Sequence, residues 1–261
     1  MSAETSTPKA KKFADSVLTS SWFDSAQCSI SSRELRAIVN DAHPRDITRP
    51  MLEPPINAFE DLWQLSHITI SYVARALAGA ILLAYGMLEN NPITIVVAAL
   101  FLPFLSQAVA VSFGAWAGDL GLARQGMKAL VVSTIASVLG GAVVTLVHGP
   151  PMLFHSFASP LPSFALSVVI GVTAGILTED DAGRRYLIGV AAAVQYGVFP
   201  VWFGFCLIAG FPERAITVAR LGAFAVNVVT ITGFALVGYL LLDIKRKDVR
   251  GFVRQHSGKG E

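Results

Sequence analysis

The chain has 261 residues, of which 53% are hydrophobic and only 15% are charged, and its mean hydropathy is +0.58. A soluble domain usually carries about 25% charged residues, because they cover its surface. The net charge of +2 is small and the basic residues are dispersed, which argues against nucleic-acid binding. The composition therefore predicts an all-α integral membrane protein with the lipid bilayer as its principal partner.

Residues 1–66 are polar, and we expect them to form a cytoplasmic tail with short or interfacial helices. Four prolines between positions 44 and 55 argue against any long element there. The segment 59–65 places Trp63 on an apolar face, which suits the interface between membrane and water. An ordinary loop explains this segment equally well.

Apolar runs of about 20 residues recur from residue 69 onward, and about 20 helical residues cross the hydrocarbon core. Turn-forming and charged residues separate the runs, as in Glu89-Asn90-Asn91-Pro92. We expect a membrane domain over 67–243 with about six transmembrane helices, followed by a basic cytoplasmic tail over 244–261. The expected helices cover 69–88, 92–117, 127–147, 162–178, 186–209 and 217–242.

Lysine and arginine residues are distributed unevenly over the expected connections. The connection between the second and third helices holds Arg124 and Lys128, and the connection between the fourth and fifth holds Arg184 and Arg185. The connections after the first and third helices hold none, whereas the C-terminal tail is rich in basic residues. The positive-inside rule therefore places both termini in the cytoplasm, in agreement with an even number of spans.

The two halves of the expected membrane domain resemble each other. The first helix ends in Gly-Met-Leu-Glu at 86–89 and the fourth in Gly-Ile-Leu-Thr-Glu at 175–179. The second and fifth helices each carry a proline near the middle, Pro103 and Pro200. Since each half has three helices, the second half enters from the opposite side, which predicts a 3+3 inverted repeat with Pro-kinked second and fifth helices. Such repeats are typical of transporters, although apolar sequence can imitate itself.

Two glutamines lie beside these prolines. Gln107 follows Pro103 by four residues, and Gln195 precedes Pro200 by five on a helix of opposite direction. Both amides therefore fall roughly 6–8 Å to the cytoplasmic side of their proline. They either line one polar site or join neighbouring helices by hydrogen bonds. For the first alternative, the expected substrate-binding residues are Pro103, Ser106, Gln107, Gln195, Pro200 and Asn227, the last of which lies midway along the sixth helix.

The sequence lacks the patterns that indicate ion coupling or catalysis. The acidic residues of the membrane domain all lie at helix ends, so a carboxylate that could bind a proton or sodium ion within the membrane is not expected. No metalloprotease, nucleotide-binding or serine-hydrolase pattern occurs. We therefore expect neither an enzyme nor a cofactor nor a metal site.

The stretch 90–119 resembles the signature of an uncharacterised prokaryotic membrane family, domain of unknown function 389. The positions that fit the signature are Asn91, Ala98, Leu100, Pro103, Gly114 and Asp119. The chain departs from it at Val97, where glycine is expected, at Gln107, where a second proline is expected, and at Phe199, which precedes Pro200 in place of proline. The resemblance covers roughly 70–242 and supports the helical topology, but it implies no established activity.

These observations favour a transporter or channel-like protein for a small solute, acting as a homo-oligomer. The resemblance implies that the protein lies in the plasma (inner) membrane of a prokaryote. The alternative is a structural or signalling membrane protein whose irregular helices serve packing alone.

Overall fold

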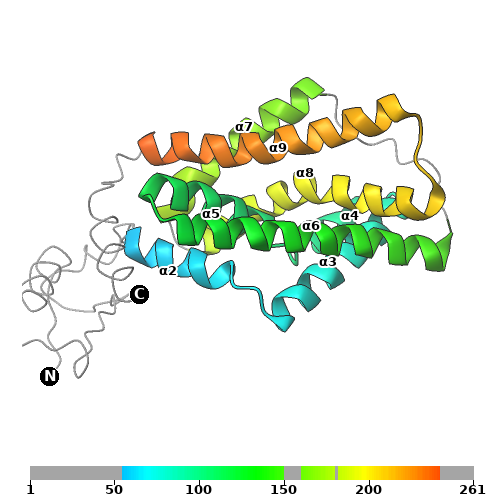
Figure 1. The fold of residues 1–261 in the computed structure, drawn as a ribbon, viewed down its shortest axis with the longest axis horizontal. Coiled ribbons are helices and arrows are strands. Elements are labelled where there is room, and N and C mark those ends of the chain that lie inside the picture. The colour runs from blue at the N-terminus through cyan, green and yellow to red at the C-terminus, as the bar shows by residue number, and fades with distance from the viewer. Residues whose placement is uncertain (1–54, 150–159, 180–181, 242–261) are drawn as a thin grey trace, which may run out of the picture. The chain divides into compact units, whose positions relative to one another are not determined.

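The computed structural model describes residues 55–149, 160–179 and 182–241 (Figure 1). The chain divides into two units, Met1–Pro50 and Met51–Glu261, and the described residues all belong to the second. Every regular element in the described ranges is helical, which confirms the expected all-α class. The elements are α2 (Pro55–Leu65), α3 (Ile70–Leu88), α4 (Pro92–Ala99), α5 (Phe104–Ala117), α6 (Leu120–His148), α7 (Pro160–Ile176), the 3-10 helix η2 (Leu177–Glu179), α8 (Ala182–Ala209) and α9 (Arg214–Leu241). The expected tails over 1–54 and 244–261 lie outside the described residues.

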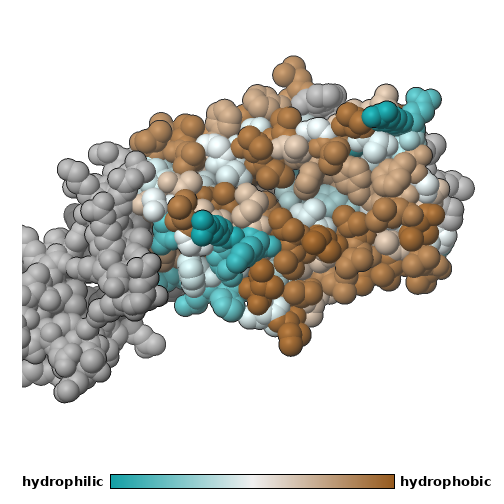
Figure 2. Space-filling model, viewed as in Figure 1, coloured by the Kyte–Doolittle hydropathy of each residue, from teal (hydrophilic) through white to brown (hydrophobic). Residues whose placement is uncertain are grey.

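Four of these helices are long and apolar enough to cross a membrane: α3, α6, the part of α8 from Gly189 to Ala209, and α9. The pair α4 and α5 passes the same test only as one bent span. The apolar α7 has 17 residues, fewer than the roughly 20 that cross the hydrocarbon core. Hydrophobic residues cover most of the visible helical surface, and hydrophilic ones gather near α2 and where α9 begins (Figure 2). The chain is therefore a multi-pass helical membrane protein by its helix lengths and composition, with four to five candidate spans in the described residues where about six were expected.

The helices α5 and α6 meet in a tight turn. Gly118 ends α5 in the left-handed conformation (φ 81°), which glycine adopts without steric cost. Asp119 then caps α6, because its carboxylate accepts a hydrogen bond from the Leu122 amide at 2.9 Å. The expected start of this helix at 127 was therefore wrong, and Arg124 and Lys128 lie on the first turns of α6 rather than in a loop.

The expected second helix, 92–117, is not one helix. It is broken between α4 and α5, whose axes differ by 43°. Turn-type bonds end α4, such as the one from the Phe101 amide to the Ala98 carbonyl at 3.0 Å. Pro103 has no N–H, and the first helical bond of α5 runs from the Gln107 amide to the Pro103 carbonyl. By contrast, Pro200 lies inside α8 without ending it, so the two prolines act differently.

A proline also begins α2. Pro55 is the first residue of this helix, a position where the missing N–H would have no helical partner anyway. Ala58 and Leu62 are buried against the rest of the unit, and the Gln125 side chain of α6 donates to the Ser66 carbonyl at 3.0 Å. The loop alternative for 59–65 was therefore wrong. The location of α2 at a membrane surface stays a prediction.

Glycines allow two helix pairs to pack with their backbones in contact. Where α6 meets α8, a Cβ atom on Gly141 would lie 2.2 Å from the Val201 carbonyl oxygen. Where α7 meets α9, a Cβ atom on Gly175 would lie 2.2 Å from the Ala235 carbonyl oxygen. Small residues at helix contacts are characteristic of membrane bundles, because the helices there gain stability mainly from close packing. The helix α3 also packs on α6, as α7 packs on α9.

Candidate functional site

Gln107 lies at the centre of a buried group of polar atoms from α3, α5 and α6. Its side chain is fully buried (0% exposed), and its Nε2 donates to the Ser133 Oγ at 2.6 Å and to the Tyr72 hydroxyl. The Tyr72 and Ser133 hydroxyls in turn approach the Ala129 carbonyl oxygen, at 2.8 and 3.0 Å. We call Tyr72, Gln107, Ser133 and the Ala129 carbonyl the first polar cluster.

The hydrogen bonds of the first polar cluster connect all of its side chains. The Tyr72 and Ser133 hydroxyls are 2.5 Å apart and either can donate to the other, so each hydroxyl proton has two acceptors in reach, the Ala129 carbonyl and the other hydroxyl. The Gln107 Nε2 donates to both hydroxyl oxygens, and the Gln107 Oε1 is buried without a hydrogen-bond partner. A buried polar atom in this state costs free energy, about 1–3 kcal/mol in mutational series.

Gln195 belongs to a second group of polar atoms, formed by α7, α8 and α9. Its Nε2 donates to the Ser163 Oγ at 2.6 Å and to the Ser163 carbonyl at 3.1 Å. The Ser163 and Ser167 hydroxyls donate to the Asn227 Oδ1 at 3.2 and 3.1 Å. Asn227 is 1% exposed, and its Nδ2 is buried without a partner. We call Ser163, Ser167, Gln195 and Asn227 the second polar cluster.

The structure therefore distributes the expected binding residues over separate places. Gln195 and Asn227 share Ser163 in the second polar cluster, whereas Gln107 has different partners in the first. Ser106 bonds only within its own turn, donating to the Pro103 carbonyl at 2.8 Å beside the break. Pro200 is buried in α8.

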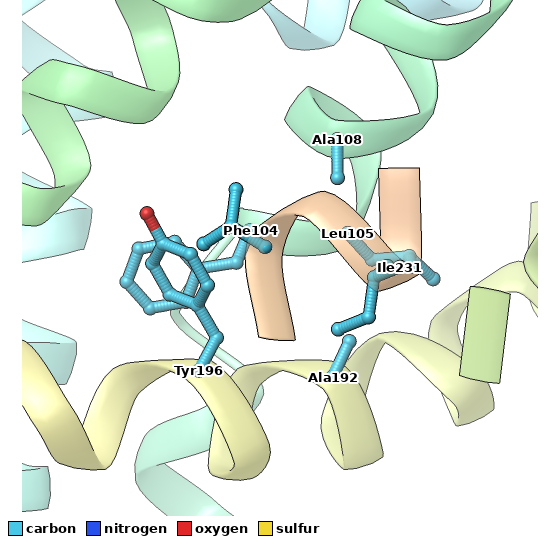
Figure 3. Close-up of a pocket in the computed structure, with 7 residues that line it drawn as sticks. Phe104, Leu105, Ala108, Ala192, Tyr196 and Ile231 are labelled. Atoms are coloured by element: carbon cyan, nitrogen blue, oxygen red, sulfur yellow. The ribbon is translucent and has the colours of Figure 1, made fainter. Parts of the chain in front are cut away.

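A small cavity lies where α5 of the first half meets α8 and α9 of the second (Figure 3). It leaves about 10 Å³ for the centre of a water molecule, close to the least space that holds one water. The lining residues, which are nearly all apolar and include neither glutamine, are Phe104, Leu105, Ala108, Ala192, Tyr196, Val228 and Ile231. The Tyr196 hydroxyl is within hydrogen-bond distance of the Thr134 Oγ1 on α6, at 2.8 Å. The cavity therefore adjoins both halves at the contact between the second and fifth expected helices.

The sequence alone did not single out Tyr72, Ser163, Ser167 or Tyr196. Tyr72 lies in the first turn of α3, where an aromatic side chain resembles an interfacial anchor. The two serines are four residues apart, and this spacing on one helix face was the available signal for a shared partner.

The polar clusters contain no charged side chain. Among the described residues, no group of three or more His, Cys, Asp or Glu side chains could hold a metal ion. Arg75, one turn after Tyr72 on α3, is exposed. The chemistry of both clusters is therefore limited to neutral hydrogen bonding.

No protein-family model, no curated protein and no solved structure matches this chain. The resemblance to the uncharacterised membrane family stays a prediction.

Proposed function

We propose that the chain is a membrane transporter or channel-like protein for a small solute, and that it acts as a homo-oligomer. The observation that carries this proposal is the break between α4 and α5. In an unbroken helix the carbonyl groups of residues 100–102 would accept hydrogen bonds from the N–H groups of residues 104–106, and none of these bonds forms. Backbone that leaves the helical ladder inside a membrane segment is stable only where it faces protein or a polar cavity. Discontinuous helices of this kind form the substrate sites of many transporters.

The proposed topology has six spans with both termini in the cytoplasm. It counts the pair α4 and α5 as one span and lets α7, extended by η2, form another. The distribution of basic residues supports this orientation, because Arg124 and Lys128 follow the turn after α5 and no basic residue follows α3 before α4.

The two polar clusters support the proposed inverted repeat. Each contains a glutamine from the second span of its half. Ser133 is the fourteenth residue of α6, and Asn227 is the fourteenth residue of α9. Tyr72 and Ser163 lie in the first turns of α3 and α7. The first and third helices of each proposed half are also in contact, which supports the same proposal.

The hydrogen bonds of the glutamines also favour a second candidate, a structural or signalling membrane protein without transport. Each Nε2 group bonds to neighbouring helices, as expected if the amides only join helices together. Under this alternative the break at Pro103 would serve packing, and the protein would carry no solute.

Reconstitution of the purified chain into liposomes separates the two candidates. Passage of small solutes is followed by light scattering after an osmotic step, and ion flux by trapped fluorescent dyes. The transporter proposal expects at least one solute to cross faster than through protein-free liposomes of the same lipid. A folded, correctly inserted protein that accelerates none of them supports the structural alternative.

A further inference from the structure

Two aromatic rings border the small cavity between α5, α8 and α9. The ring centroids of Phe104 and Tyr196 are 4.1 Å apart, and Figure 3 shows the two rings together on one side of the cavity, with Leu105 and Ile231 on the other. Both rings are almost completely buried, at 2% and 4% exposed. The ring pair therefore fills the space where the start of α5 meets α8.

This ring pair lies directly beside the break between α4 and α5. Phe104 is the first residue of α5 and follows Pro103. Gly197, the residue after Tyr196, brings the backbone of α8 to the same place. A Cβ atom on Gly197 would lie 3.1 Å from the Phe104 Cε2 and 3.2 Å from the Leu102 Cδ1. Since α8 packs against the break itself, a path from the break into the cavity passes the two rings.

Tyr196 contacts three other helices. Its hydroxyl is within hydrogen-bond distance of the Thr134 Oγ1 on α6, at 2.8 Å. Its ring centroid lies 4.1 Å from that of Phe104 on α5 and 4.8 Å from that of Phe224 on α9. Small shifts of packed helices change contacts of this kind between two arrangements. The ring pair is therefore placed to respond to a movement of α5 against α8.

The cavity behind the rings is closed to a hydrated solute. It leaves about 10 Å³ for the centre of a water molecule, and none of its lining side chains is charged. An apolar space of this size gives water too few polar partners and gives an ion nothing to replace its hydration shell. Apolar constrictions close channels in this way, by excluding water.

We infer that the Phe104–Tyr196 ring pair is the gate of the proposed solute pathway, and that the described conformation is the closed one. The inference rests on the proposed transport function and names the residues that control passage. Opening requires α5 and α8 to separate at Gly197, so that the two rings lose contact and water enters the cavity.

Solute flux through the full chain in liposomes tests the gate. Osmotic light scattering measures the passage of water and glycerol for the wild type, for Phe104→Ala and for the control Phe113→Ala. Phe113 is a matched residue, because it is a buried aromatic side chain of α5 whose ring contacts Tyr239, and it does not line the cavity.

We expect Phe104→Ala to raise the flux about tenfold, the factor by which loss of one aromatic contact shifts an equilibrium between closed and open states. The Phe113→Ala variant should match the wild type. Phe104→Leu and Phe113→Leu remove less volume and give the same comparison if the alanine variants do not fold.

A single thiol in the cavity tests the gate without any measurement of flux. The chain carries Ala192→Cys at a cavity-lining position that is 1% exposed, with Cys28 and Cys206 replaced by alanine. We expect a water-soluble thiol reagent to label this cysteine slowly while the Phe104 ring is present. Labelling should become fast in the Phe104→Ala background and stay slow in the Phe113→Ala background.

The outcomes distinguish the gate from the function on which it rests. Fast labelling while the Phe104 ring is present overturns the gate, and so does an equal rise in flux in the Phe104 and Phe113 variants, which indicates general loosening of the bundle. Either result leaves the transport proposal in place. If no solute crosses the wild type or any variant although the Phe104 variant exposes the cavity thiol, the transport proposal fails, and the inference with it.

Discussion

Substitution of Gly204 by alanine tests the backbone contact between α6 and α8. An added Cβ atom would lie 2.1 Å from the Val138 carbonyl oxygen and 2.8 Å from the Ala142 amide nitrogen. Real Cβ atoms do not approach other atoms closer than 3.0 Å, so the two helices must separate by about 1 Å. Overpacking of this kind costs about 1–3 kcal/mol, and here backbone atoms, which cannot rotate away, place the cost at the upper end.

The gain in helix propensity from Gly204→Ala, about 1 kcal/mol, offsets part of that cost. The net loss of stability is then about 2 kcal/mol, or a fall in melting temperature of about 4–8 °C for a protein of this size. Thermal unfolding in detergent, followed by circular dichroism, measures it. The matched control is Gly189→Ala on the same helix, where no atom lies within 4 Å of the added carbon. If the Gly204 variant melts no lower than the Gly189 variant, the close packing of α6 on α8 is refuted.

Three further predictions concern topology, capping and the second polar cluster. In whole cells, a cysteine that replaces the exposed Glu89 should react with an impermeant thiol reagent, and a cysteine that replaces the exposed Arg124 should not. If only the cysteine at position 124 is labelled, the topology is the reverse of the proposed one. Asp119→Ala removes the cap of α6 and should lower the unfolding free energy by about 1 kcal/mol, and an unchanged value would show that the cap is dispensable. A double-mutant cycle of Gln195→Leu with Ser163→Ala should give a coupling of about 0.6 kcal/mol in detergent unfolding, whereas additive effects would contradict the observed bonds.

The helices could be predicted from the sequence because their signals are local. Runs of apolar residues locate α3, α6, α8 and α9, and the Asn91-Pro92 pair marks the start of α4 through a side-chain cap and a proline at the first helical position. The start of α6 at Leu120 was missed because the first turns of this helix carry Arg124 and Lys128, which resemble a polar loop although the backbone is helical.

The partners of the glutamines could not be predicted, because they come from helices far apart in the sequence. Gln107 bonds Tyr72 and Ser133, which are 35 and 26 residues away, and only the packing of α3 on α6 brings them together. It could not be predicted either that the helix breaks at Pro103 and continues through Pro200. A proline removes one helical bond in either case, and whether the helix breaks depends on what packs around it.

Chemical blockage at the break between α4 and α5 tests the proposed solute pathway most directly. The variant carries Ser106→Cys beside the break, with Cys28 and Cys206 replaced by alanine so that a single thiol remains. Its solute flux in liposomes is measured before and after a water-soluble thiol reagent, and mass spectrometry quantifies the labelling. We expect the thiol to react and the flux to fall to the protein-free level. Complete labelling with unchanged flux would contradict a pathway at the break.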